Sequence, residues 1–562
     1  MRRHLDAGRR RRRRFGTGVA AAAALAVAVG AGVQSSSAAW VSSTTLGDAV
    51  GSASSSCTTP GVYRTTASSR WLAGSVAGAP LTARAALAPM TADNPASIAV
   101  FPAGAVPQGS DAATTAVSSA SAAAALGSAL TAPSGSQTQY AAATSTGTSV
   151  AGVGAVDTAG IASGSAPALG ALDVDGLLGQ VSGGTAAAGD LSRLRLAVGR
   201  VAATSTLREC SRRWGASLAS ALDRGVTVSS LSLTTRTASV TRLVGATGAQ
   251  RAAVRTAFDA VTGGAGTSPA ETSLAGTAGT GLVGAVNAAL GSLGSLARAG
   301  GASATVRIGA DLGAVDTAAA QTTPAGGLVR LDASAGDVVV DVGSLAPAAP
   351  APNTALLTAA DASRIASGTS AAAGAVVTDV GAAWSAAASE ATVSVDVSVP
   401  VVLAGATIAT VGESMSGTVA QFAAGTETRS APSVVVLSVL DPTSLLAAVT
   451  AQLAPLLLGP VEGAVGTVVS APLTAAVADA KGSLATSLTA ARSALPGELG
   501  VLPAVLSVTL NEQPDVAPHP APAAGTGGGY RTTALRLKVL GGSALDLAVA
   551  TTSVGPDRTV NE

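Results

Sequence analysis

The sequence predicts an α+β fold in which antiparallel β-sheets pack against helices rich in alanine and leucine, as two similar halves behind an N-terminal signal helix. Two periodic patterns support this prediction. Between Val393 and Val399, valine alternates with serine and aspartate, which is typical of an antiparallel strand with one buried and one wet face. Further along, apolar residues recur at spacings of four and seven, as on a helix face that packs against a partner helix. This stripe consists of Leu473, Val477, Leu484, Leu488 and Leu495.

The first half shows regular patterns from about residue 171, after a stretch, 41–152, that is rich in Ser, Thr, Ala and Gly. Alternation of apolar and polar residues predicts strands over 172–175 and 226–233. Between them we expect a helix, because four apolar residues recur at helical spacing. These are Leu191, Leu194, Val198 and Val201.

The second half is expected to follow a linker or surface loop at 263–281, which is rich in Gly, Ser, Thr and Ala. Strands are predicted over 304–308 and 337–342. Thr358 and Asp361 have the spacing of a capping box. The helix that follows is expected to carry Val376, Val377, Val380 and Trp384 on one face.

A strongly apolar run, 445–458, follows the helix-start signal Asp441-Pro442. Prolines, glycine and Glu462 interrupt the run before it reaches the roughly 20 residues that a membrane span needs. We therefore expect a buried or amphipathic helix. The last strands are predicted over 506–510, 535–539 and 545–549, with a Pro/Gly-rich excursion at 514–529.

These patterns divide the chain into a signal peptide (1–39), a first α+β region (40–262), the linker (263–281) and a second α+β region (282–562). The segment Leu172–Leu177 resembles Val339–Leu345, since both carry an Asp-Val or Val-Asp step before a glycine. An internal repeat of this kind supports two similar halves.

An export signal is predicted for the first 39 residues. Six arginines, Arg9–Arg14, precede an Ala/Val-rich stretch, 19–33, and then small residues ahead of Trp40. This order suits a helix that inserts with its positive end in the cytoplasm and is then cleaved. We expect cleavage near Ala38 or Ala39, by the general route or by the twin-arginine route. The protein is thus expected to be extracellular or at the cell surface, touching the membrane only transiently.

The composition excludes a nucleic-acid partner. The net charge of +1 includes the arginine run that leaves with the signal, so the mature chain is acidic. Phosphate binding needs clustered Lys and Arg. The short group Arg208, Arg212 and Arg213 is interpreted as the solvated face of a helix. Aromatic residues make up only 2% of the chain, so its cores must be built from Ala, Val and Leu.

The two cysteines of the chain, Cys57 and Cys210, are predicted to form a disulfide, because an exported protein meets oxidising conditions. Closing so long a loop contributes roughly 4 to 5 kcal/mol in the chain-entropy model. The alternative is two unpaired thiols.

No catalytic, cofactor-binding or metal site is predicted. His519 lies between two prolines in a loop, where a catalytic base would be poorly held. A glycosidase that uses two carboxylates needs no histidine, but the available acidic residues are interpreted as a solvated face. They are Asp173 with Asp175, Asp337 with Asp341, and Glu413. The Cys/His sets of zinc sites and the residue order of a calcium loop are absent from the sequence.

Seven stretches add a resemblance that runs in order along almost the whole mature chain. They include Ser-Ser-Arg-Trp-Leu-Ala-Gly-Ser at 68–75, Leu-Asp-Val-Asp-Gly-Leu-Leu at 172–178 and Leu-Ser-Val-Thr-Leu-Asn-Glu-Gln at 506–513, with others at 139–149, 338–342, 352–357 and 533–555. Together they resemble the actinobacterial surface proteins called the choice-of-anchor G family. The resemblance implies an exported protein with a surface anchor and no assigned activity. The end of this chain, 555–562, departs from the pattern because it carries no sortase motif, apolar tail or basic stop.

We therefore expect an exported, non-catalytic protein of the cell envelope or the medium, structural or adhesion-like, with a cell-wall or extracellular partner and no cofactor. Two alternatives stay open. One is a partner-binding or self-assembling module that uses the stripe from Leu473 to Leu495. The other is an enzyme that acts on cell-wall polymer through paired carboxylates.

Overall fold

The computed structural model describes most of the chain beyond the predicted signal. The described residues are 63–81, 88–94, 110–118, 124, 126–131, 135–157, 167–181, 189–213, 215–263, 268–293, 297–311, 313–318, 327–347, 350–431, 433–436, 447–448, 451–452, 454–516, 529–556 and 558–559. The signal peptide, Cys57, the helix-start signal Asp441-Pro442 and His519 lie outside these residues.

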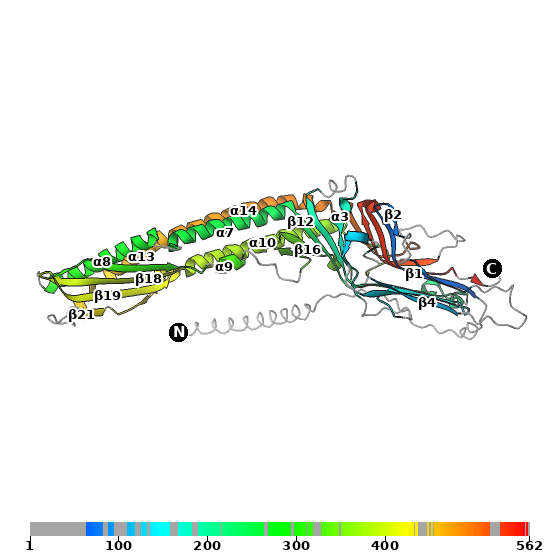
Figure 1. Cartoon of the computed structure of the whole chain (residues 1–562), viewed down its shortest axis with the longest axis horizontal. Helices are drawn as coiled ribbons and strands as arrows, with labels where there is room; N and C mark the ends of the chain where they lie inside the picture. Colours follow the sequence, from blue (N-terminus) through cyan, green and yellow to red (C-terminus); the bar gives the residue numbers. More distant parts are fainter. Residues whose placement is uncertain are drawn as a thin grey trace, which may run out of the picture.

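The molecule is an elongated rod with three parts (Figure 1). Three β-sheets form a wide head at one end, long helices form a stem, and a fourth sheet backed by helices forms the tip at the far end. One cluster of buried hydrophobic residues runs through all three parts, from Leu72 in the head to Val395 in the tip. The predicted α+β class with antiparallel sheets is confirmed.

The described residues form three antiparallel sheets in the head. The first runs in the order β17 (Thr354–Leu356), β22 (Leu506–Glu512), β23 (Tyr530–Val539), β24 (Leu545–Val554), β1 (Tyr63–Val76) and β2 (Ala79–Pro80), with β3 (Met90–Asn94) and β25 (Arg558–Thr559) paired to β1. The second runs in the order β11 (Leu222–Val228), β10 (Val201–Arg208), β7 (Thr148–Gly154), β6 (Ser136–Thr144) and β4 (Ser110–Ser118). The third runs in the order β15 (Val329–Asp332), β16 (Asp337–Asp341), β12 (Leu231–Thr237), β9 (Leu191–Val198), β8 (Gly170–Asp173) and β5 (Leu130–Thr131).

Short helical turns connect the strands of the head. They are η5 (Gly127–Ala129), α3 (Val174–Leu178), α5 (Glu209–Arg213), α6 (Leu218–Ala221), η6 (Val342–Leu345), α15 (Leu502–Val505) and η9 (Leu540–Gly542). The three strands predicted near the C-terminus are confirmed as β22, β23 and β24.

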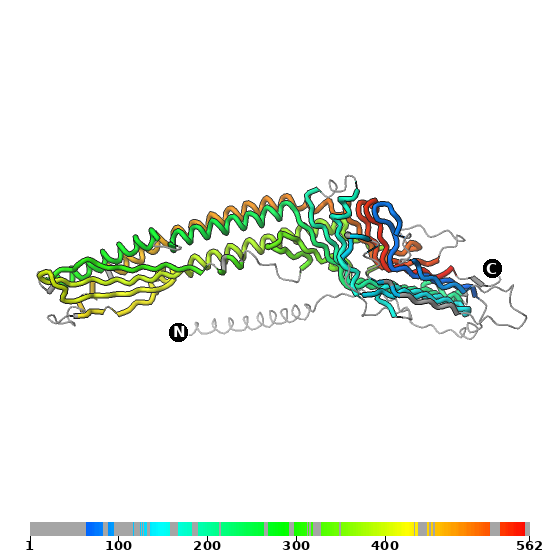
Figure 2. The backbone as a smooth tube through the Cα atoms, viewed as in Figure 1, coloured from blue at the N-terminus to red at the C-terminus, as the bar shows by residue number. Residues whose placement is uncertain are grey.

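Segments from both ends of the chain lie side by side in the first sheet (Figure 2). β1 pairs with β24, and Tyr63 at the start of β1 faces Thr559 of β25. In the third sheet, β12 of the first predicted region pairs with β16 of the second. The two predicted regions therefore do not fold as separate units.

The second and third sheets meet at two corners of the chain. The turns Gly199–Arg200 and Ser229–Ser230 carry the chain from one sheet to the other, and they bond to each other through two N–H to carbonyl hydrogen bonds of 2.9 Å. A Cβ at residue 199 would come within 2.3 and 2.5 Å of the two serine hydroxyls, so this close approach requires glycine. The strand predicted over 226–233 is consequently two strands, β11 and β12.

The helix predicted through Leu191 and Val201 is wrong, because these residues lie in strands β9 and β10. Arg193 has a left-handed φ of 55° at a bulge where two residues of β9 face one residue of β12. The extra residue lengthens the spacing between the buried Leu191 and Leu194 from two to three. The corner after Val198 adds another spacing of three. A bulge and a corner thus imitate the period of a helix.

The stem consists of α7 (Ala238–Thr262), α10 (Ala359–Glu390) and α14 (Ala471–Gly500), with α14 packed against both other helices. The predicted capping box is confirmed: the Thr358 hydroxyl accepts from the Asp361 N–H at 3.3 Å, and the Asp361 carboxylate accepts from the Thr358 N–H at 3.0 Å. The predicted stripe of α14 is buried along its whole length. Its partner helices therefore belong to the same chain.

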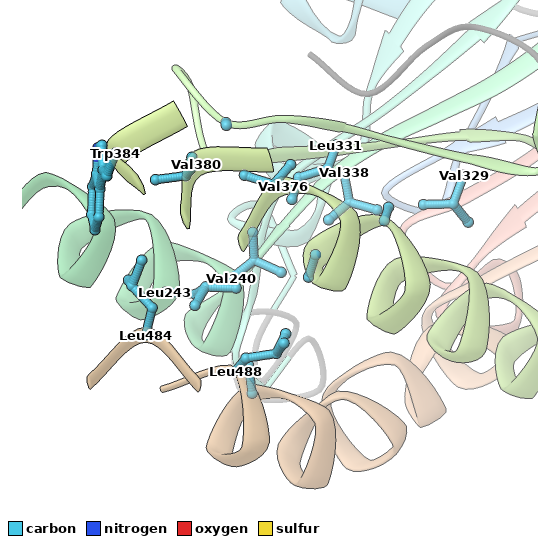
Figure 3. Packing of buried hydrophobic residues seen from close by; sticks show 14 of the residues in the cluster. Val240, Leu243, Val329, Leu331, Val338, Val376, Val380, Trp384, Leu484 and Leu488 are labelled. Carbon is cyan, nitrogen blue, oxygen red and sulfur yellow. The ribbon is translucent and has the colours of Figure 1, made fainter. Parts of the chain in front are cut away.

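The packing of the stem joins side chains from all three helices (Figure 3). Val240 and Leu243 of α7, Trp384 of α10 and Leu484 of α14 belong to one cluster and are fully or almost fully buried. Because α14 has neighbours on two sides, its apolar stripe leaves no face for a second copy of the chain. Self-assembly through this stripe would therefore require the stem to open first.

The tip is built on a hairpin of two long strands covered by a helix. Its sheet consists of β13 (Ala297–Ala299), β14 (Ser303–Gly309), β18 (Thr392–Leu403), β19 (Ala406–Thr418), β20 (Thr428–Arg429) and β21 (Ser433–Val436). Its helical segments are α8 (Pro269–Leu293), α11 (Val419–Ala424), η7 (Ala454–Leu458), α13 (Gly459–Val465) and η8 (Gly466–Ser470), while the short α9 (Gly313–Ala318) packs on α10. The predicted face of Val393 to Val399 is confirmed, since its four valines are buried.

The linker predicted at 263–281 is wrong for most of its length, because residues 269–281 are the first half of α8. α8 packs on β14 and β18 and against η7. At Gly281, a Cβ would come within 2.5 Å of the carbonyl oxygen of Leu456. The small residues that suggest a loop in the sequence therefore allow a close helix contact.

By length and composition alone, three helices among the described residues are apolar enough to cross a membrane. They are Pro269–Gly291, Ala359–Glu390 and the run Leu456–Val505, which has 50 residues. In the structure each of them packs along other helices or along the tip sheet. The predicted apolar run 445–458 is described only in part. At its end, Leu457 and Leu458 are buried.

Replacing Leu484 by alanine should destabilise the molecule by about 3 kcal/mol, because it opens a cavity between α14 and its neighbours. Urea unfolding measures this change. The matched control is Ser483→Ala, an exposed position on the same helix, which should change the free energy of unfolding by less than about 0.5 kcal/mol. Equal stabilities of the two variants would contradict the packing of the stem.

Candidate functional site

The predicted carboxylate pair Asp173 and Asp175 serves the local backbone. The Asp173 side chain accepts from the Gly176 N–H at 3.2 Å and so caps α3. Asp175 accepts from the Leu194 N–H at 2.9 Å and ties the start of α3 to β9. Burial raises the pKa of Asp175 above its ordinary value. Both carboxylates are used to hold the strand-to-helix turn in place.

The second predicted pair has the same kind of role. Asp337 accepts from Arg193 Nη1 at 2.7 Å and from Arg236 Nε at 2.9 Å, and so connects the bulge of β9 to β12 and β16. Only 8% of Asp337 is exposed, so its assignment to a solvated face is wrong. Asp341 caps η6 by accepting from the Ser344 N–H at 3.3 Å.

The resemblance between the segments around Asp173 and Asp341 has a structural counterpart within one sheet. β8 and β16 hold equivalent places on either side of the central pair of β9 and β12. Each strand ends in an aspartate that caps a short helical turn. The similar sequences therefore reflect one local strand-and-cap motif that occurs twice in the third sheet.

The short helix α5 carries two further predicted features. Arg212 is exposed and pairs with Glu209 at 3.2 Å, which agrees with a solvated face for the arginine group. Cys210 is 4% exposed. Because Cys57 lies outside the described residues, the disulfide between Cys57 and Cys210 stays a prediction.

The outer face of the tip sheet carries rows of hydroxyl groups. In β18 the valines from Val393 to Val399 are buried, so the polar residues between them lie on the outer face. The neighbouring strands β14 and β19 place further polar residues beside them on this face. Ser303 faces Ser398 with their hydroxyls 2.9 Å apart, and Thr305 faces Asp396. The polar residues of this face on β14, β18 and β19 are Ser303, Thr305, Arg307, Ser394, Asp396, Ser398, Thr410, Ser414 and Ser416.

A shallow hollow of about 360 Å³ lies on this face. Gly412, which has no side chain, lies opposite Ser398 in the next strand. The Ser414 hydroxyl donates to Ser430 Oγ at 2.9 Å at the border of the hollow. The residues around the hollow are mainly serines, together with Asp396, whose carboxylate lies on this face, and Glu413, whose side chain lies on the inner face. The hollow therefore suits hydrogen bonding to a polar ligand. We define this face with its hollow as the candidate binding face.

Glu413 lies on the opposite, inner face of the same sheet. It is in phase with the buried Val411 and Met415 and directly faces the buried Val397. Only 6% of Glu413 is exposed, so its assignment to a solvated face is also wrong. The alternation of β19 was a usable signal for this position, because it places residues 411, 413 and 415 on one side.

The environment of Glu413 favours the protonated acid. Among the described residues, no hydrogen-bond donor reaches its Oε2 atom. The nearby Arg429 is engaged by two other carboxylates, with Nε 2.6 Å from Glu427 Oε1 and Nη2 3.0 Å from Glu462 Oε1. Burial raises the pKa of Glu413 to about 7, although the charge of Arg429 acts in the opposite direction.

Comparison with known families covers head, stem and tip together. Residues 67–555 match a family described as a domain of unknown function (DUF8394). The chain belongs to this family. The match begins within β1 and ends just after β24, so it spans the head, the stem and the tip of this chain. No curated protein and no solved structure matches the chain.

Glutamine in place of Glu413 should stabilise the protein above pH 7. The unfolded chain releases the proton near pH 4.5, whereas the folded chain keeps it up to about pH 7. The folded state therefore binds more protons between these values, and its stability falls as the pH rises. Glu413→Gln removes this loss of about 3 kcal/mol. Urea unfolding at pH 4.5 and pH 8 measures it.

The control for this experiment is Asp396→Asn on the adjacent strand, where the carboxylate is exposed on the outer face. This variant removes a carboxylate from the same sheet and leaves the buried position 413 unchanged. The raised pKa would be contradicted if the difference in the free energy of unfolding between the wild type and Glu413→Gln were the same at the two pH values.

Proposed function

We propose that the protein is an exported, non-catalytic rod of the choice-of-anchor G type, which acts in an adhesion-like manner by presenting its tip to an extracellular partner. The observation that carries this proposal is the pairing of the first and the last described strands, β1 and β25, in the head. Tyr63, which follows the predicted export signal by about 20 residues, pairs with β25 in the head. A chain held at the cell by either end would therefore point its tip outward.

The helices of the stem give the rod its reach. The helical run Leu456–Val505 has 50 residues and connects the tip with the head. At a rise of 1.5 Å per residue, it spans about 75 Å. A helical run of this length holds the candidate binding face far from the head. Such a separation suits a spacer between a surface and a partner.

The chemistry of the candidate binding face indicates the kind of partner. Hydroxyl groups and one carboxylate offer many hydrogen bonds and little net charge, while Arg307 lies at one end of the same face. Such a surface suits a polar extracellular polymer, such as cell-wall material, rather than a nucleic acid, which requires clustered positive charge. The support for a non-catalytic role is that Asp173, Asp337 and Asp341 are engaged in caps and ion pairs.

Fractionation of the producing cells should place the protein in the medium or at the cell surface. Intact-mass analysis should show an N-terminus at Ala39 or Trp40, because the signal is removed. In denaturant, where both residues are accessible, alkylation should modify Cys57 and Cys210 only after reduction, because they are predicted to be joined. Full-length protein in the cytosol would overturn the proposal. Alkylation without reduction would instead favour the alternative of two unpaired thiols.

The tip should be accessible outside the cell. Thr305→Cys places a thiol on the exposed face of β14, and Val306→Cys places one on the buried face of the same strand. A maleimide that does not cross membranes should label Thr305→Cys on intact cells or in the medium and should leave Val306→Cys and the wild type unlabelled. Labelling of Thr305→Cys only after cell lysis would contradict the presentation of the tip.

A further inference from the structure

A cavity lies at the neck of the rod, where the stem joins the tip. Its volume of about 470 Å³ is in the range of small-molecule binding sites. The end of α10, α11, η8 and the start of α14 line it. Its apolar floor includes Ala388, Val419 and Val477, all of which are buried. We refer to this space as the neck cavity.

Lys481 lies at the edge of the neck cavity and is the only charged residue among the described residues that line it. The aliphatic carbons of its side chain pass over α10 at Gly381, where a Cβ would lie 3.3 Å from both Cγ and Cε of the lysine. Its Nζ atom donates to the Ser385 hydroxyl at 3.3 Å. Because Gly381 has no side chain, the side chain of Lys481 can pack directly on the backbone of α10.

The charge of Lys481 has no counter-charge in the part of the chain that the structure describes, where none of the ion pairs includes it. All other basic residues of the mature chain except Lys538 and His519 are arginines. An ammonium group beside an apolar cavity is complementary to a ligand that has an apolar body and an anionic head.

The wall of the neck cavity includes an irregular helical turn. η8 is a π-helical turn of five residues inserted between α13 and α14, and its last residue, Ser470, lines the cavity. Turns of this type shift side chains out of the regular helical register and occur frequently at functional sites. The turn is a second feature, independent of the charge, that distinguishes the neck from the rest of the stem.

We propose that the neck cavity binds a small anionic amphiphile of the fatty-acid type. Its hydrocarbon chain would lie against Ala388, Val419 and Val477, and its carboxylate would bind the Lys481 ammonium beside Ser385. Such a ligand contacts α10, α11 and α14 together, so its binding joins the stem to the tip. The proposal rests on the cavity, its lining and its charge, and it is independent of the proposed function.

Calorimetric titration of the mature protein with decanoate, below its micelle-forming concentration, tests the proposal. We expect one saturable site. Decanol and decyltrimethylammonium should bind at least about tenfold more weakly, because neither can replace the charge-assisted bond to Lys481. Lys481→Met should weaken decanoate binding by a similar factor, whereas Lys481→Arg should retain most of it. The matched control is Lys538→Met, on β23 in the head, which should leave binding unchanged.

Two variants test the cavity itself. Ala423→Leu on α11 and Ala478→Leu on α14 each add volume at an exposed lining position, where the fold tolerates the change. Both should abolish binding, and circular dichroism should show that their helix content equals that of the wild type. The proposal is overturned by the absence of a saturable site, by equal affinities for decanoate and decanol, or by undiminished binding in both filled variants.

Discussion

The burial of α14 between α7 and α10 is the contact on which the rest of the structure depends. The buried stripe from Leu473 to Leu495 continues, without a break in the hydrophobic cluster, into the head at one end and into the tip at the other. Because the run from Leu456 to Val505 starts against α8 in the tip and ends next to β22 in the head, its packing sets the distance between the two sheet-bearing parts. Loss of this contact would separate the tip from the head rather than loosen one domain.

The chain builds this rod almost without aromatic residues, which make up 2% of the sequence. Small residues make up for them by letting backbones approach closely. Gly281 allows α8 to lie against Leu456, and Gly381 leaves room on α10 for the aliphatic side-chain carbons of Lys481. The main aromatic residue of the stem, Trp384, is fully buried, and its Nε1 atom has no hydrogen-bond partner among the described residues. A core of this kind has little tolerance for larger side chains where helices cross.

Much of the secondary structure was predictable, because it depends on local order along the chain. The valines of β18, the capping box at Thr358 and the stripe of α14 all follow from spacing alone. The predictions are wrong where tertiary contacts give a residue spacing or a local composition a cause other than the usual one. A bulge at Arg193 and a corner at Gly199 make two strands look helical, and the small residues of 269–281 look like a loop although they form a packed helix. The ion pairs of Asp337 were not predictable, since they join strands far apart in the sequence, whereas the alternation of β19 was a signal for the burial of Glu413 that composition alone did not give.

The amino-acid sequence by itself determined the class of the fold, the positions of β18, α10 and α14, and the wet and buried faces of β18, because these properties depend on residues two to four positions apart. Only the tertiary structure decided that β1 and β25, the first and last described strands, pair in the head, that the α14 stripe is satisfied within the molecule, and that a cavity with Lys481 lies at the neck. These features arise from contacts between segments far apart in the sequence or from the shape left between packed helices, and neither leaves a periodic signal in the sequence.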